Sequence, residues 1–145
     1  MEGARPRILC LDDKPENLLV RKALLEQFGC EVVIAYESQA CLHAATSEQF
    51  DLALIDYHLA EEVTGEDVAR DLRSCAPGMI LVMLTGDPNL PDSAIRSVDA
   101  VLTKGASGPK ELLQLIEDLL PDRTLKPRRP LLVPGSTPPP ASDTR

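Results

Sequence analysis

Short apolar runs alternate with amphipathic segments along the first 120 residues of the chain. Runs such as Leu52–Ile55 and Met79–Leu84 are almost wholly apolar, which is typical of strands buried on both faces of a parallel sheet. Between the runs, apolar side chains recur at helical spacing, as at Val68, Leu72 and Cys75. This pattern predicts strands near residues 7–11, 31–35, 51–55, 79–84 and 99–103, and helices near 15–28, 38–47, 65–76, 91–97 and 109–120.

Proline and glycine mark several of the predicted helix ends. Pro15 and Pro109 suit a first helical turn, where the missing N–H of proline has no hydrogen bond to lose. Gly29 suits the position just after a helix. Pro77 prevents the helix near 65–76 from continuing.

Strands that alternate with helices predict an α/β fold. Parallel neighbouring strands need a long crossover connection, usually a helix, so strands that are each followed by a helix indicate a parallel sheet. The crossover helices then cover both faces of the sheet. Right-handed crossovers leave only a few arrangements. We therefore predict a doubly wound five-stranded sheet of the flavodoxin-like (βα)5 type, with strand order 2-1-3-4-5 and a switch point between strands 1 and 3.

The composition changes at Pro121. Seven of the 13 prolines lie in the last 25 residues, including the run Pro138–Pro140. Such a segment is not expected to form regular helix or sheet. We predict one folded domain over residues 6–120 and a proline-rich, disordered tail over 121–145.

Charge and composition exclude several classes of protein. The net charge is −8, and an acidic body repels phosphates, so nucleic acid is not an expected partner. No apolar run approaches the roughly 20 residues of a membrane span, and no signal peptide is apparent, so a cytoplasmic location is expected. The four cysteines form no C-x-x-C pair; we expect buried, reduced thiols, with Cys10 and Cys75 on apolar periodic positions.

Polar residues of particular kinds follow four of the predicted strands. Asp12 and Asp13 come after the first strand, Asp56 after the third, Thr85 after the fourth and Lys104 after the fifth. In an open parallel sheet the carboxyl ends of the strands form the ligand crevice. Each residue taken singly has an ordinary explanation, such as a helix cap, a turn or a solvated lysine. Their joint placement predicts a site.

Three neighbouring carboxylates need compensation. Two carboxylates about 4 Å apart repel by roughly 4 kcal/mol at an effective dielectric near 20, and Lys104 cancels only one charge. Oxygen ligands select a hard cation such as Mg²⁺. We predict Asp56 as the nucleophile of phosphoryl transfer, with Asp12, Asp13, Asp56 and the backbone carbonyl of His58 as metal ligands. Lys104 and Thr85 would contact phosphoryl oxygens.

Five stretches carry a family resemblance: ILCLDDKPENL, DLALIDYHL, Gly65 before a helix, LTGD and VLTKG. Together they resemble the receiver domains of bacterial two-component response regulators, over about residues 6–120. The resemblance implies Mg²⁺-dependent transfer of a phosphoryl group to Asp56 from a histidine kinase or phosphotransfer protein. It implies a signalling protein that acts through protein contacts, forms a dimer on phosphorylation in some cases, and catalyses at most its own phosphorylation and dephosphorylation.

The chain departs from the family pattern in the segments that usually report phosphorylation. Val101 stands where the family has an aromatic residue, and Leu59–Ala60 replaces the usual Met-Pro pair. Pro88 and Pro91 lie in the short segment before Lys104, so the helix near 91–97 should be stunted. A phosphorylation-independent interaction module is therefore the main alternative. An aspartate-nucleophile phosphohydrolase is disfavoured, because Asp12 and Asp13 are adjacent rather than in a D-x-D arrangement.

Overall fold

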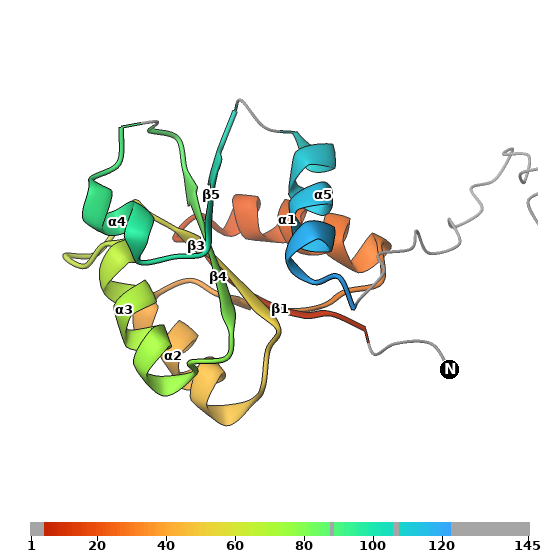
Figure 1. Cartoon of the computed structure of the whole chain (residues 1–145), viewed down its shortest axis with the longest axis horizontal. Coiled ribbons are helices and arrows are strands. Elements are labelled where there is room, and N and C mark those ends of the chain that lie inside the picture. The colour runs from red at the N-terminus through yellow and green to blue at the C-terminus, as the bar shows by residue number, and fades with distance from the viewer. Residues whose placement is uncertain (1–4, 88, 106–107, 123–145) are drawn as a thin grey trace, which may run out of the picture.

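A computed structural model describes residues 5–87, 89–105 and 108–122 of the chain. Five parallel strands form one sheet in the order β2-β1-β3-β4-β5 (Figure 1). The predicted fold class and strand order are confirmed. The strands are β1 (Arg7–Leu11), β2 (Glu31–Ala35), β3 (Leu52–Asp56), β4 (Ile80–Thr85) and β5 (Ala100–Thr103).

Helices cover both faces of the sheet (Figure 1). Side chains of α2, α3 and α4 pack in one buried cluster with the sheet, and side chains of α1 and α5 pack in the other. The helices are α1 (Pro15–Gln27), α2 (Ser38–Ser47), α3 (Gly65–Cys75), α4 (Asp92–Arg96) and α5 (Pro109–Leu119).

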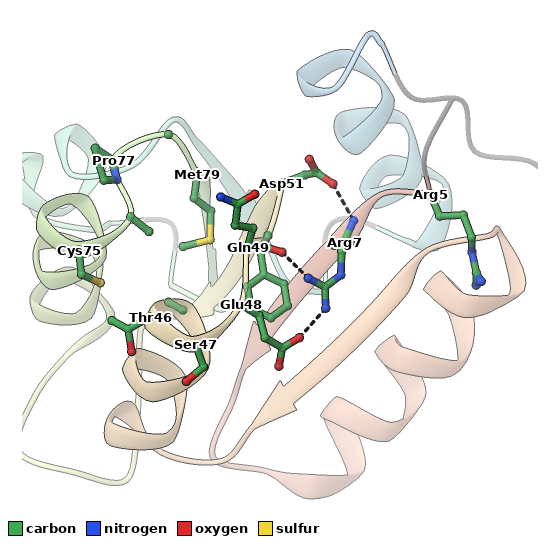
Figure 2. A pocket seen from close by; sticks show the side chains of 14 residues that line it. Arg5, Arg7, Thr46, Ser47, Glu48, Gln49, Asp51, Cys75, Pro77 and Met79 are labelled. Atoms are coloured by element: carbon green, nitrogen blue, oxygen red, sulfur yellow. Dashed lines mark hydrogen bonds and ion pairs between the residues drawn. The ribbon is translucent and has the colours of Figure 1, made fainter. Parts of the chain in front are cut away.

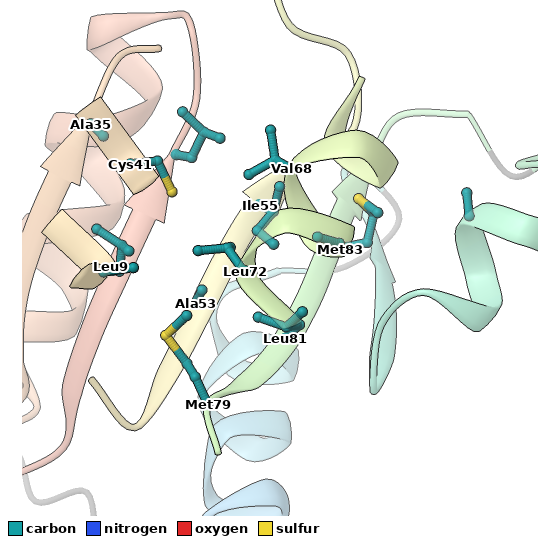
Figure 3. Packing of buried hydrophobic residues seen from close by; sticks show 14 of the residues in the cluster. Leu9, Ala35, Cys41, Ala53, Ile55, Val68, Leu72, Met79, Leu81 and Met83 are labelled. Carbon is teal, nitrogen blue, oxygen red and sulfur yellow. The ribbon is translucent and has the colours of Figure 1, made fainter. Parts of the chain in front are cut away.

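Alternate residues of the central strands feed the two clusters. On β3, Ala53 and Ile55 belong to the cluster under α2 and α3, whereas Leu52 and Leu54 belong to the cluster under α1 and α5. Figure 3 shows the first cluster, in which Leu72 of α3 lies over the sheet. Because successive strand residues point to opposite faces, a strand covered on both sides must be apolar throughout. This requirement explains the continuous apolar runs in the sequence.

The local signals for helix ends act as predicted. Pro15 and Pro109 occupy the first turns of α1 and α5. Gly29 follows α1 with a φ of 92°, a left-handed conformation that favours glycine. α3 begins with a capping box, in which Thr64 and Asp67 satisfy each other's backbone N–H groups.

The prediction that Cys75 is buried is wrong. Cys10, Cys30 and Cys41 are buried free thiols, but Cys75 is exposed. Cys75 is the last residue of α3, and the stripe that buries Leu72 continues four residues on at Ala76, which packs against the same cluster, so Cys75 lies on the flank of the stripe.

The prediction of a stunted helix near 91–97 is confirmed, because α4 has only five residues. No helix in the described ranges is both long and apolar enough to span a membrane. Pro88 and most of the predicted 121–145 tail, from 123 onward, lie outside the described residues.

Candidate functional site

The strand order brings the predicted site residues to one edge of the sheet. Asp12 follows β1, Asp56 ends β3, Thr85 ends β4 and Lys104 follows β5. These four strands are consecutive neighbours in the sheet. The Lys104 N–H donates to the Thr85 carbonyl oxygen at 2.6 Å, so the ladder between β4 and β5 continues up to the site.

Three carboxylates converge at this edge. One oxygen from each of Asp12, Asp13 and Asp56 can be chosen so that all lie within 4.8 Å of one another. Asp12 and Asp56 are buried, and Asp13 is half-buried. A cluster of oxygen donors at this spacing fits a hard divalent cation, which takes carboxylate and water ligands. The predicted fourth ligand, the backbone of His58, follows β3 by two residues.

Lys104 lies between two of the carboxylates. Its Nζ is 2.8 Å from Asp56 Oδ1 and 3.3 Å from Asp12 Oδ2. The side chain is 30% exposed, so the pair is only partly screened by water. A single ammonium therefore pairs with two buried carboxylates.

The two buried carboxylates differ in acidity. Burial raises the pKa of Asp56, and although Lys104 opposes this effect, the neighbouring Asp12 and Asp13 add to it, so the pKa lies above its usual range. Burial also acts to raise the pKa of Asp12. There it is outweighed by the Lys14 N–H, which donates to Asp12 Oδ1 at 3.0 Å, and by the charges of Lys104 and Arg21. The pKa of Asp12 is therefore lowered, and its ionised form is favoured.

Two further contacts to Asp12 come from α1. Asn17 Nδ2 donates to Asp12 Oδ2 at 3.4 Å, and Arg21 Nη2 lies 3.6 Å from the same oxygen. Neither residue is among the predicted site residues. The available signal was the spacing of Leu18, Arg21 and Leu25, which puts an arginine on the buried stripe of the helix.

Thr85 and His58 occupy different surroundings. Thr85 is buried; its hydroxyl accepts from the Asp87 N–H at 2.9 Å and donates to the Asp87 carbonyl at 3.1 Å. This local turn holds the hydroxyl at the end of β4. His58 is exposed, and its ring meets the Tyr57 ring edge-on at a centroid distance of 4.9 Å. The imidazole therefore lies at the rim of the site.

Gly65 permits close packing behind Asp56. A Cβ at this position would lie 2.6 Å from the Asp56 carbonyl oxygen and 2.8 Å from both Tyr57 Cα and Met83 Sδ. Real Cβ atoms do not approach backbone this closely. The Gly65 N–H also donates to the Tyr57 carbonyl at 2.8 Å. A glycine is therefore needed where α3 starts directly against the end of β3.

A groove of about 860 Å³ lies at the opposite edge of the sheet, lined by residues 45–51 and 75–79 with Arg5 and Arg7 (Figure 2). Arg7, one of the two arginines that line the groove, forms ion pairs with Glu31 and Glu48. The groove lies apart from the carboxylate cluster at the other end of the strands.

Comparison with known proteins agrees with this geometry. Residues 8–117 match the family model described as the response regulator receiver domain. The chain belongs to this family. The resemblance stated from the sequence is thus confirmed, and receiver domains are in general signalling modules rather than turnover enzymes.

The receiver domain is similar to parts of longer proteins. Over 59 residues it is 46% identical to the sensor protein GacS of Pseudomonas syringae pv. syringae, a match that spans 41% of this chain but only 6% of GacS.

Among solved structures, it resembles a CheY-like receiver domain protein of Methanospirillum hungatei JF-1, with 32% identity and a TM-score of 0.75, covering 81% of this chain and 96% of that one. The fold is shared with TrrA of Thermotoga maritima in complex with Mg²⁺-BeF, at 24% identity and a TM-score of 0.73, covering 79% and 99%.

Proposed function

We propose that this receiver domain accepts a phosphoryl group on Asp56 from a histidine kinase or phosphotransfer protein, in a Mg²⁺-dependent reaction. The observation that carries the proposal is the position of Asp56. It is a buried carboxylate at the carboxyl end of β3, 2.8 Å from Lys104 and within one cluster of oxygen donors with Asp12 and Asp13. Such an arrangement suits an attack on phosphorus rather than a structural ion pair.

The transfer step has a simple balance. A carboxylate oxygen of Asp56 forms a bond to phosphorus, and the phosphorus–nitrogen bond of a phosphohistidine donor breaks. The electron pair stays on the imidazole, which then takes a proton. Asp56 must be ionised to attack, and the Lys104 ammonium favours that form against the effects of burial and of the neighbouring carboxylates.

The remaining residues would stabilise the transferred group. Lys104 is placed to exchange its contact with Asp56 for one with a phosphoryl oxygen. The Thr85 hydroxyl would give up its bond to the Asp87 carbonyl and donate to another oxygen. Asp12, Asp13, Asp56 and the His58 carbonyl would hold Mg²⁺, which supplies positive charge to the oxygens of the phosphoryl group.

The surroundings of the site support a protein as the donor. Leu19 and Val20 of α1 are 56% and 71% exposed, and α1 begins directly after the acidic pair. An apolar surface next to a charged centre is typical of a docking face.

All four cysteines are free thiols, which suits the reducing cytoplasm.

The test is phosphorylation with acetyl phosphate and Mg²⁺, followed by intact mass. The protein should gain one phosphoryl group, and it should gain none after Asp56→Ala or in the presence of EDTA. Asp71→Asn, which changes an exposed carboxylate on α3, should label like the unaltered protein. Equal labelling of Asp56→Ala would sink the phosphoacceptor proposal. Sustained phosphate release from small phosphoesters would instead favour a hydrolase.

One observation favours the second candidate, an interaction module independent of phosphorylation. The region that would report the modification is reduced: α4 has five residues, and the half-buried Val101 packs on the cluster that contains Leu90 and Ala94. Partners captured equally well with and without beryllofluoride would support this module. Capture that depends on beryllofluoride would support signalling by phosphorylation, through a downstream protein or a second copy of the chain.

A further inference from the structure

The buried face of α1 contains a charge where an apolar residue is expected. Leu18 and Leu25 are fully buried on this face, and Arg21 lies three residues after one and four before the other. Positions with this spacing share one side of a helix. The Arg21 side chain is accordingly only 12% exposed. A buried guanidinium is costly unless it is compensated.

Arg21 is compensated by the candidate site itself. Its Nη2 lies 3.6 Å from Asp12 Oδ2, which is an ion-pair distance but longer than a hydrogen bond. Its Nη1 is buried and has no hydrogen-bond partner in the described part of the chain. The contact therefore acts through charge, and the guanidinium lies on the same helix face as the buried Leu18 and Leu25.

Counting charges shows what this contact does. The three carboxylates carry three negative charges, and Lys104 and Arg21 carry two positive charges. Unlike Lys104, whose side chain is 30% exposed and can swing toward a ligand, Arg21 is confined under α1. A divalent cation that binds Asp12 would lie close to this fixed positive charge, and the two repel each other in a poorly solvated site.

We propose that Arg21 is a positioning residue, a fixed counter-charge that holds the Asp12 carboxylate and lowers the affinity of the site for divalent cations. The inference rests on the proposed metal site. It gives the site a built-in threshold: Arg21 neutralises part of the negative charge without a cation, and a cation occupies the site only at a concentration that overcomes its repulsion.

The experiment is a Mg²⁺ titration of four proteins: the unaltered chain, Arg21→Gln, Arg21→Lys and the control Lys22→Gln. Tyr57, next to Asp56, provides the fluorescence signal in a Tyr36→Phe background, because the chain has two tyrosines and no tryptophan. Lys22→Gln removes the same charge one residue away, from a side chain that is 34% exposed and pairs with Glu26. Circular dichroism verifies that each variant is folded.

Arg21→Gln should lower the Kd for Mg²⁺ by about 3- to 30-fold, since a nearby positive charge is lost from a poorly screened site. Arg21→Lys, which keeps the charge, and Lys22→Gln should both stay within about 2-fold of the unaltered protein. An unchanged or higher Kd in Arg21→Gln overturns the proposal. A decrease in Arg21→Lys as large as in Arg21→Gln also overturns it.

Two further results keep the outcome decisive. If Arg21→Gln does not fold, guanidinium NMR on the unaltered protein replaces it: Mg²⁺ should shift the Arg21 signals, and unmoved signals overturn the proposal. If the unaltered protein binds no Mg²⁺, or Asp13→Asn binds it equally well, the proposed function fails. If binding depends on Asp13 but not on Arg21, only the present inference fails.

Discussion

At the edge of the sheet formed by the carboxyl ends of the strands (the carboxyl edge), Asp12 and Asp56 are buried and both pair with Lys104. At the opposite edge, formed by the amino ends (the amino edge), Arg7 pairs with Glu31 and Glu48 near the surface. The Arg7, Glu31 and Glu48 side chains are 33%, 48% and 43% exposed. Both edges use acidic and basic side chains that lie at or near the ends of strands. They differ in how much water reaches the charges.

This difference in burial separates chemistry from scaffolding. Exposed pairs are screened and contribute little. At the amino edge the guanidinium of Arg7 also lies 4.9 Å from the Phe50 ring centre. It donates a hydrogen bond to the Gln49 carbonyl (Figure 2), so its charge and N–H groups are engaged by neighbouring residues. At the carboxyl edge, three carboxylates face two cations, Lys104 and Arg21, and a divalent cation would neutralise the excess negative charge.

The largest effect on stability is expected from Gly65→Ala at the carboxyl edge. The new methyl group would meet the Asp56 carbonyl at 2.6 Å, and such overpacking costs about 1–3 kcal/mol of unfolding free energy. Gly78→Ala is the matched control beside the amino edge, because a Cβ there meets nothing within 4 Å. Urea denaturation of both variants compares them. Equal losses in the two would show that the close approach at Gly65 is not a constraint.

Opposite effects are expected from Asp12→Asn and Asp56→Asn in EDTA at neutral pH. Asp12 has a lowered pKa, so its charge stabilises the fold, and its loss should cost about 1–3 kcal/mol. Asp56 has a raised pKa, so its charge opposes folding, and Asp56→Asn should stabilise by about 1 kcal/mol. Urea denaturation measures both changes, and the same sign in both variants would contradict the assignment of their environments.

The pH dependence follows from the same two shifts. The contribution of Asp12 is present above its unfolded pKa of about 4, and it is lost as pH falls through the lower folded value. The contribution of Asp56 is present below its unfolded pKa and is lost as pH rises through the higher folded value. The stabilisation by Asp56→Asn should therefore disappear on acidification, which denaturation at several pH values can measure.

A smaller effect is expected from Arg7→Met at the amino edge. Losing two exposed ion pairs and the contact with Phe50 should cost about 0.5–1 kcal/mol. Labelling by acetyl phosphate should be unchanged. Arg70→Met, which removes a 62% exposed arginine paired with Glu66, is the control and should cost less. A slower labelling of Arg7→Met would mean that the two edges are coupled.

The smallest effect on stability is expected from Cys75→Ser, within about 0.5 kcal/mol because the side chain is exposed. The thiols should nevertheless separate clearly by reactivity. Burial raises the pKa of Cys10 and Cys41 to about 12 and that of Cys30 to about 11, which suppresses the reactive thiolate. In the native protein a thiol reagent should modify one cysteine quickly, and Cys75→Ser should remove that reaction. Rapid modification of a second thiol would contradict the burial pattern.

The sequence by itself determined the fold class and which residues gather at the carboxyl ends of the strands, although it missed the contacts of Asn17 and Arg21 with Asp12. Short, continuous apolar runs that alternate with helical patterns favour strands covered on both faces, and parallel strands need crossover connections, so the order of the elements predicted the topology. Because the carboxyl ends of parallel strands share one edge, Asp12, Asp56, Thr85 and Lys104 were predicted to meet, as they do. Their roles in phosphoryl transfer are still proposals.

Only the tertiary structure decided how the charges are shared. The sequence gives no distance between Lys104 and the two carboxylates, no direction for the pKa of Asp12 against that of Asp56, and no partner for Arg21. It also misplaced Cys75, since positions three and four residues after Leu72 both fit the helical period and only the packing shows that Ala76 is the one on the cluster. These properties depend on burial and on contacts between residues as far apart in the sequence as Asp12 and Lys104, which are separated by 92 positions. The local pattern of apolar and polar residues contains no information on either.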